Sequence, residues 1–374
     1  MGAFRKWFPV TEKYIYLNHA ANSPEPLPVL AAMQEYLKAC SSHGTVMEDD
    51  WKHKPTAARA KFAKLLDCDS SNISFLPNVS SAANIIAGGL DWKPGDNVVV
   101  TCDQFPANVY PWMFLKSAGV EVRFADWQTY GFTDSIRRIA DSRTRVVAVS
   151  WVEYFTGCRH NLGDVGILCK DLGILFFVDA IQGLGALPLR QAETDADVIA
   201  VGGQKWLLGP DGQGAAYFNG KVLDRLKPCA YSWRSIEDFM NFDSYRLNLK
   251  PGAERLEAGT QNWAGVIGFG AGLELILDVG PEVIANRIQS LTTQLIEELN
   301  KLPVDLLTPV SWEDRAGIVT FRPKSIGAEE LRANLLSQGI VCSARRGALR
   351  ISPHFYNTPE EIDTFADALT KLIM

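Results

Sequence analysis

Two polar residues stand just beyond short apolar runs of the chain and could do chemistry together. Asp179 follows the apolar run 174–178, and Lys205 comes shortly after the run 198–201. Runs this short and this apolar are typical of strands that are covered on both faces. Because ligands of an open α/β sheet bind beyond the carboxyl ends of its strands, we expect the carboxylate and the amine to share one pocket.

This pair suits pyridoxal 5'-phosphate. A lysine forms a Schiff base with the aldehyde, and a carboxylate keeps the pyridine nitrogen protonated, so that the ring accepts electrons. Aspartate and lysine also occur at strand ends for structural reasons alone, but the surroundings favour chemistry here. Gly202 and Gly203 let the backbone approach a ligand closely, and the apolar turn 206–210 keeps water from the Lys205 amine. Such desolvation lowers the pKa of a lysine and frees it for attack.

Composition limits the other possibilities. The 374 residues suffice for two domains, or for one large domain with a smaller companion. The net charge of −6 comes without a basic cluster, so we expect neither nucleic acid nor a membrane surface as a partner. No apolar run reaches the roughly 18 residues that span a bilayer, and the N-terminus lacks a signal-peptide pattern. The seven cysteines, without a CxxC pair, and the five histidines predict a cytoplasmic protein without a metal site.

The order of apolar and amphipathic segments predicts the fold. Short buried strands alternate with helices up to about residue 218, which indicates an α/β fold with a mostly parallel central sheet and helices on both faces. The strands are predicted at 73–76, 97–101, 120–125, 145–152, 174–178 and 198–201. Helices and short strands after residue 260 predict a smaller C-terminal α+β unit. We therefore assign residues 15–259 to a large domain and 260–374 to a small one, with residues 1–14 packing on the small one.

Further candidate residues lie at the ends of these elements. Ser80 and Ser81 open a helix, where they either cap it or bind an anion together with the free N–H groups. Phe105 is either a core residue or a ring that stacks on a flat ligand, and Tyr154 needs a hydrogen-bond partner such as a pyridoxal hydroxyl. Asn18 and His19 lie in a turn that either is an ordinary loop or lines the pocket.

Six residues stand in an order that resembles one known family: Ser80, Ser81, Phe105, Asp179, Gln182 and Lys205. The sequence resembles the class V aminotransferases of the fold-type I pyridoxal phosphate enzymes, a group that includes cysteine desulfurases and isopenicillin-N epimerase-like proteins. The resemblance runs from YLNHAA near the start to ISPHFYNTPEEID near the end. It implies the fold-type I architecture, pyridoxal 5'-phosphate as cofactor, and a homodimer with shared active sites.

The resemblance also implies roles for single residues. Lys205 would hold the cofactor and move protons, Asp179 would pair with the pyridine nitrogen, and Gln182 would contact the ring oxygen. Ser80 and Ser81 would bind the phosphate.

Two more roles lie outside the large domain. Thr260 would reach the phosphate of the neighbouring subunit. Arg350 would clamp the carboxylate of the substrate, a task that suits a bidentate guanidinium.

Several positions depart from the family pattern. Gln204 stands where many relatives have a hydroxyl or a histidine that holds phosphate. Phe105 replaces the stacking histidine of cysteine desulfurases, and Tyr154 replaces an asparagine. The loop before Arg350 is short and lacks the nucleophilic cysteine, because Cys342 lies too early. Desulfuration through a protein persulfide is therefore not expected.

These observations predict an enzyme that acts on an amino acid, with Lys205 as the general base at Cα. Amino-group transfer is the expected reaction by analogy with the family. A lyase that cleaves a Cβ bond, such as C–S elimination, and an amino-acid epimerase remain alternatives. Arg345 and Arg346 either bind an acidic substrate or belong to a solvated turn. The intact set of Asp179, Gln182 and Lys205 argues against a binding protein that has merely kept the fold.

Overall fold

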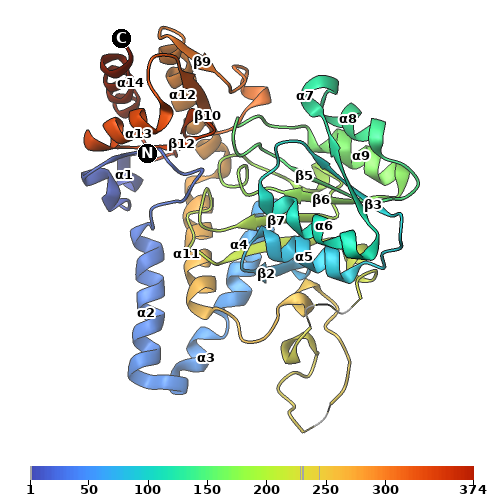
Figure 1. Ribbon diagram of the computed structural model, residues 1–374. Helices are drawn as coiled ribbons and strands as arrows, with labels where there is room; N and C mark the ends of the chain where they lie inside the picture. The colour runs from blue at the N-terminus through green and yellow to red at the C-terminus, as the bar shows by residue number, and fades with distance from the viewer. Residues whose placement is uncertain (1, 228, 230, 244) are drawn as a thin grey trace.

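A seven-stranded sheet forms the centre of the computed structural model, which describes residues 2–227, 229, 231–243 and 245–374 (Figure 1). In spatial order its strands are β2 (Ile73–Leu76), β8 (Gly214–Phe218), β7 (Val198–Gly202), β6 (Leu175–Asp179), β5 (Thr144–Ser150), β3 (Asn97–Thr101) and β4 (Glu121–Ala125). Within this sheet β8 is antiparallel to both of its neighbours, and the other pairs are parallel. The predicted mostly parallel sheet is therefore confirmed.

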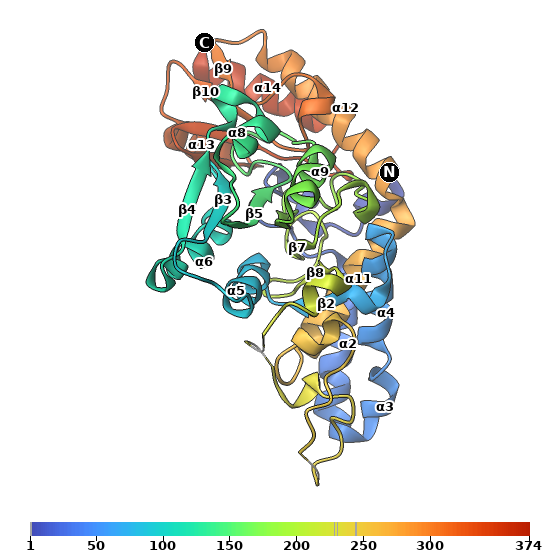
Figure 2. The same cartoon turned by 90° about the vertical axis from the view of Figure 1, so that its right-hand side faces the viewer.

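Helices cover both faces of this sheet because side chains alternate along strands that are buried on both sides. In β6, Phe176 and Val178 pack into one core, whereas Leu175 and Phe177 pack into another. The first core includes residues of α4 (Lys54–Leu66), α8 (Phe132–Ile139), α9 (Leu162–Leu172) and α11 (Trp263–Val279). The second includes residues of α5 (Val79–Gly89), α6 (Tyr110–Met113) and α10 (Gly220–Leu223). In Figure 2, α5 and α4 lie on opposite sides of β2 and β8.

A smaller, antiparallel sheet belongs to the C-terminal part of the chain. Its strands are, in spatial order, β12 (Ser343–Arg345), β13 (Ala348–Ile351), β10 (Val319–Pro323) and β9 (Val304–Leu306). They share a separate core with α12 (Pro281–Leu299), α13 (Ala328–Ser337) and α14 (Pro359–Ile373). This is the predicted smaller α+β unit, drawn in orange and red in Figure 1.

The sequence predicts the boundary between the two units at residues 259 and 260. The helix directly after it, α11, contributes Val266, Phe269 and Leu273 to the core beneath the large sheet and packs on α4. The separate C-terminal core takes its first helical residue, Leu291, from the middle of α12. By its packing, α11 therefore belongs with the large unit, although it follows the predicted boundary.

The N-terminal segment packs against the end of the chain. Phe8 stacks on Tyr356 with ring centroids 3.8 Å apart, and Arg5 forms an ion pair with Glu361 at 2.6 Å. The elements not yet named are α1 (Gly2–Arg5), β1 (Ile15–Tyr16), α2 (Leu27–His43), α3 (Glu48–Trp51), α7 (Trp127–Tyr130) and β11 (Ile340–Val341). Strand β1 pairs in parallel with β11, which ties the N-terminal segment to the small unit.

No single helix within the described residues is both long enough and apolar enough to cross a membrane. Helices α11 and α12 meet both criteria, length and apolar composition, only as a pair, which is bent by 77°.

Candidate active site

Asp179 ends β6, and Lys205 follows the adjacent strand β7, so the sheet brings the two residues to the same edge. Both side chains are buried. Burial raises the pKa of the Asp179 carboxyl to about 6, against the opposing effects of a hydrogen bond from the Ile181 N–H and of the Lys205 charge. Burial also lowers the pKa of the Lys205 amine to about 8. Near neutral pH this amine is thus much closer to its reactive neutral form than an exposed lysine is.

Close backbone packing fixes the turn that carries Lys205. A Cβ atom on Gly202 would overlap the end of the Gln204 side chain. A Cβ atom on Gly185, whose φ is +99°, would overlap the carbonyl oxygen of Trp206. Gly185 would meet fixed backbone atoms and has a positive φ, so this position accepts glycine only, whereas the flexible Gln204 side chain can shift away from a Cβ atom on Gly202.

Gln182 connects this turn to the N-terminal segment. Its Nε2 donates to the Ala20 carbonyl at 3.0 Å, and its Oε1 accepts from Trp206 Nε1 at 3.0 Å. His19 is fully buried next to Trp206 and lies with its Nε2 2.7 Å from the Tyr356 hydroxyl. These contacts give both residues a structural role. Their predicted contacts, with the cofactor ring for Gln182 and with the substrate for His19, stay predictions.

Two aromatic rings form a wall beside Lys205. The Phe105 ring is 38% exposed, and its centroid lies 5.6 Å from Lys205 Nζ. Tyr154 packs edge-on against it, with ring centroids 5.3 Å apart. Phe105 is therefore not a core residue, and its predicted stacking on a flat ligand stays a prediction.

Arg350 reaches the site from β13 of the small unit. It is 1% exposed, and its Nη1 donates to the Tyr154 carbonyl at 2.7 Å while its Nε donates to Ser343 Oγ at 3.3 Å. Its Nη2 is buried without a hydrogen-bond partner. Burial, followed by the nearby charge of Arg345, lowers the pKa of Arg350 to about 9. A buried, unsatisfied guanidinium N–H is costly, which favours an anionic ligand at this point.

The N-terminus of α5 is capped by a residue that the sequence analysis overlooked. Asn78 Oδ1 accepts hydrogen bonds from the Ser81 N–H at 3.0 Å and from the Ser81 hydroxyl at 3.1 Å. The interpretation of the serines as caps is therefore wrong, because Asn78 fills that role. Ser80 and Ser81 instead lie half-buried in the first helical turn, and because Ser81 donates to Asn78, their phosphate-binding role stays a prediction.

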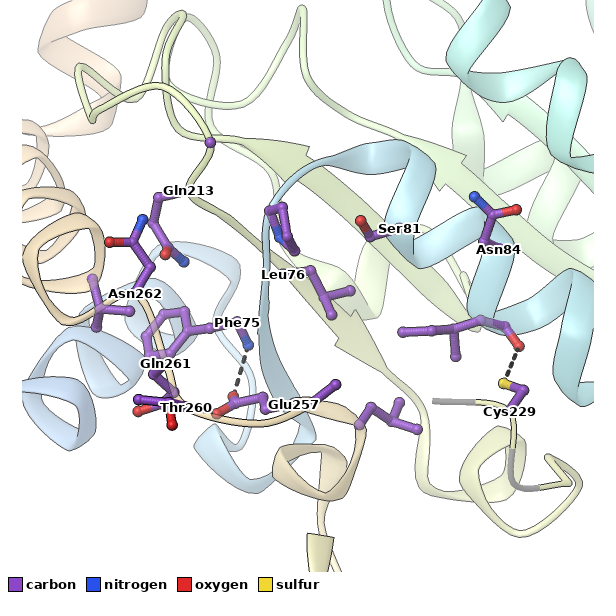
Figure 3. A pocket seen from close by; sticks show the side chains of 16 residues that line it. Phe75, Leu76, Ser81, Asn84, Gln213, Cys229, Glu257, Thr260, Gln261 and Asn262 are labelled. Atoms are coloured by element: carbon purple, nitrogen blue, oxygen red, sulfur yellow. Dashed lines mark hydrogen bonds between the residues drawn. The ribbon is translucent and has the colours of Figure 1, made fainter. Parts of the chain in front are cut away.

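A cavity of about 490 Å³ opens next to this helix end (Figure 3). Its walls include Ser81 on α5 and Thr260, Gln261 and Asn262 on the segment that leads into α11. Lys205 is not among its lining residues, so the cavity does not include the reacting end of the predicted site, and a phosphate at Ser81 stays a prediction. The predicted role of Thr260 toward a neighbouring subunit stays a prediction.

A buried polar network behind Phe105 was not anticipated from the sequence. Gln104 Nε2 donates to Thr101 Oγ1 at 2.6 Å and to Glu153 Oε1 at 3.1 Å, and Gln104 Oε1 accepts from the Ser150 hydroxyl at 2.7 Å. His160 Nε2 lies 3.1 Å from the same Glu153 oxygen. The network joins β3 to β5 and holds in place the loop that carries Phe105. Gln104 and Glu153 each follow a buried strand, the signal that identified Asp179.

Two of the cysteines, Cys342 and Cys158, are poorly suited to nucleophilic chemistry. Cys342 lies in the core of the small unit, where burial raises its pKa to about 12. Burial raises the pKa of Cys158 to about 12 as well. Thiolates, and not thiols, are the attacking species, so neither side chain is activated. Within the described residues, no three His, Cys, Asp or Glu side chains gather as metal ligands would.

The residues present fit pyridoxal phosphate. Buried polar atoms without a partner are rare in proteins, yet several lie among the predicted site residues. They are Asn18 Oδ1, His19 Nδ1, Gln204 Oε1 and Arg350 Nη2. Lys205 offers an amine for the aldehyde, Asp179 a carboxylate for the pyridine nitrogen, and Phe105 a ring for stacking.

Comparisons with known proteins identify the family and the fold of the chain. Residues 15–365 match the family model described as aminotransferase class-V. A probable cysteine desulfurase of Methanothermobacter thermautotrophicus is 30% identical, with 98% of this chain and 97% of that protein covered. A probable cysteine desulfurase of Pyrococcus abyssi is 29% identical, with coverages of 99% and 96%. The apo structure of a cysteine desulfurase from Thermococcus onnurineus NA1, 28% identical, has a TM-score of 0.91 and covers 99% of this chain and 97% of its own.

The family model spans nearly the whole chain, and the structural match spans both units. The chain therefore belongs to the class V aminotransferase family, has the fold-type I architecture, and is an enzyme that uses pyridoxal phosphate.

Proposed function

We propose that this enzyme removes the α-proton of an amino acid with Lys205 and transfers the amino group to an acceptor. The observation that carries the proposal is the placement of the buried Lys205 amine, whose pKa is lowered to about 8, beside Asp179 and an exposed aromatic ring. Pyridoxal phosphate, when bound, supplies the ring that withdraws electrons from Cα. A neutral amine within reach of Cα is the base that such chemistry needs.

The other residues are proposed to position the substrate. The unpartnered Nη2 of Arg350 would bind the α-carboxylate, because a buried guanidinium gains most from a bidentate anion. The ring of Phe105 would hold the cofactor flat and exclude water from one face. Phenylalanine has no proton to exchange, so proton movement at Cα falls to Lys205 alone. We further propose a homodimer in which Thr260 serves the partner's phosphate site.

A second candidate is C–S bond cleavage, which the names of the desulfurase relatives support. In this candidate reaction neither Cys342 nor Cys158 would attack the sulfur, since burial raises the pKa of both thiols to about 12. Lys205 would serve the same first step, the removal of the α-proton. The two candidates therefore differ only in what happens after Cα is deprotonated.

A panel of L- and D-amino acids separates these reactions. We expect the purified holoenzyme to form a keto acid in a manner that depends on an added 2-oxo acid acceptor. Release of sulfide or pyruvate without an acceptor would overturn transamination in favour of elimination. Loss of optical rotation with neither product would indicate epimerisation.

The Lys205→Ala variant tests the proposed base. It should lose at least about a hundredfold in rate, the usual share of a general base, together with covalent borohydride trapping of the cofactor. Lys170→Ala, which removes an exposed lysine of α9, is the matched control and should retain both. Trapping that survives in Lys205→Ala would place the attachment site elsewhere.

A further inference from the structure

The short hairpin of β12 and β13 places two arginines on one of its faces. Ser343 pairs with Arg350 and Arg345 pairs with Ala348 in the antiparallel register. Directly paired residues share a face, and so do residues two apart along a strand. Arg345 and Arg350 therefore point to the same side of the hairpin.

That side faces the active site. The opposite face carries Ala344 and Leu349, which pack into the core of the small unit. On the near side, Arg350 donates to the carbonyl of Tyr154, one of the two rings beside Lys205. The charges of Arg350 and Arg345 both lower the pKa of the Lys205 amine, so all three cations lie within electrostatic reach of one another.

Arg345 and its neighbour in sequence, Arg346, have different surroundings. Arg346, at the hairpin turn with φ +51°, forms an ion pair with Asp103 at 2.7 Å and lies over the Tyr154 ring, 5.6 Å from its centroid. This contact ties the hairpin turn to the loop that carries Phe105. Arg345 is exposed, and no carboxylate in the described part of the chain lies within ion-pair distance of it.

The nearby acids do not balance the positive charge. Asp103 is engaged by Arg346, and Asp179 faces Lys205. Glu153 is buried, and burial together with the charges of Asp103 and Asp179 raises its pKa well above the usual value, so its carboxyl favours the neutral form. The space in front of the hairpin thus offers two guanidiniums to a ligand.

We propose that the substrate is an amino acid with a second acidic group on its side chain, which Arg345 binds while Arg350 binds the α-carboxylate. This rests on the proposed function, because it assumes that an amino acid occupies the site. A guanidinium binds a planar carboxylate or a sulfinate through two parallel hydrogen bonds, which an ammonium cannot do. Aspartate, glutamate and cysteine sulfinate belong to the class that this arrangement recognises.

The test measures binding without requiring turnover. The holoenzyme is titrated with L-aspartate, L-glutamate and L-cysteine sulfinate, and with the uncharged L-asparagine, L-glutamine and L-alanine. The readout is the change in the visible absorption band of the bound cofactor. We expect at least one of the acids to bind roughly tenfold tighter than its uncharged counterpart, as a charge-assisted contact predicts.

Arg345→Gln should remove this preference and leave the affinity for the uncharged amino acids unchanged. Arg345→Lys keeps the charge but not the paired geometry, and should retain only part of the preference. Arg137→Gln, which removes an exposed charge on α8, controls for net charge and should behave like the unaltered enzyme. Because Arg345 is exposed, its replacement should not unfold the protein, which a thermal melt of each variant verifies.

Two results would overturn the inference. One is an enzyme that binds acids and amides equally, and the other is an Arg345→Gln variant that weakens every ligand alike. Failure of the proposed reaction gives a different pattern. Acids would then still bind in an Arg345-dependent way, but no keto acid would form when an acceptor is added.

Discussion

Two walls of the site are built in different ways. The first, the wall of strand ends, carries Asp179 at the end of β6 and Lys205 after β7. Both strands lie inside a seven-stranded sheet and pair with neighbours on both sides. The hairpin wall carries Arg345 and Arg350 on β12 and β13, and β12 is the edge of a four-stranded sheet. Asp179 and Lys205 of the first wall are both buried, whereas in the second Arg350 on β13 is buried and Arg345 on β12 is exposed.

The difference separates two tasks. A central strand is held by ladders of hydrogen bonds on both sides, so the groups at its end keep their positions and suit a constant ligand such as a cofactor. An edge strand has one neighbour and tolerates change more readily. Within one fold, the hairpin is thus the natural place for side chains that select the substrate. The three predictions below test this division.

The largest effect is expected at the buried arginine of the hairpin wall. Arg350→Ala should raise the KM for every amino acid by about tenfold to a hundredfold, because it removes a desolvated charge that binds the carboxylate common to all of them. Steady-state kinetics across the panel measure this change. Ser343→Ala, which removes only the 3.3 Å contact to Arg350 Nε, should have a much smaller effect. An unchanged KM in Arg350→Ala would leave the hairpin wall without a carboxylate site.

The wall of strand ends could be predicted from the sequence because its signals are local. A short apolar run followed by a polar residue identified Asp179 and Lys205, and the parallel arrangement of the sheet brought them together. The same signal marks Gln104 and Glu153, and their contact was missed because β5 lies beside β3 although β4 comes between them in the chain. Strand order is set by packing across the whole sheet and cannot be read from one segment.

The hairpin wall was harder to predict. Strand β12, Ser343–Arg345, is short and polar and has no apolar alternation that marks a strand. The register of β12 with β13 decides which arginine faces the site. A shift by one residue would turn Arg346 toward the site and Arg345 away from it. From the sequence the two residues were equivalent candidates. The antiparallel β8 escaped prediction in a similar way, since its direction follows from its pairing with β2 and β7.

The second prediction concerns the capture of cofactor by the apoprotein. The reaction needs the neutral Lys205 amine, and burial lowers the pKa of that amine to about 8. The association rate should therefore rise about fivefold between pH 7 and pH 8 and level off above about pH 9. With an exposed lysine, the association rate would continue to rise beyond pH 10. Stopped-flow absorbance after mixing apoprotein with pyridoxal phosphate measures this profile. A rate that still climbs beyond pH 10 would show that the wall of strand ends does not desolvate its amine.

The smallest effect, a change in the free energy of unfolding, is expected at Glu153 in the buried network with Gln104 and His160. Burial raises its pKa well above the usual value, and one of its oxygens has no partner. A group whose pKa is raised by folding stabilises the folded state below its unfolded pKa, and this stabilisation is lost as the pH rises toward the folded pKa. Glu153→Gln stays neutral and keeps an oxygen for Gln104 and His160. The variant should therefore match the parent apoprotein near pH 4 to 5 and exceed it by about 1 kcal/mol or more near pH 8.

Denaturant unfolding of the two apoproteins at both pH values measures the difference, and Glu330→Gln on the exposed face of α13 should show none. If Glu153→Gln were instead less stable near pH 8, the carboxyl would be ionised and acting as a charged acceptor for His160. The wall of strand ends would then hold two buried negative charges, at Asp179 and Glu153. These two negative charges would partly offset the positive charges of Arg345 and Arg350. The preference for acidic substrates should then be weaker.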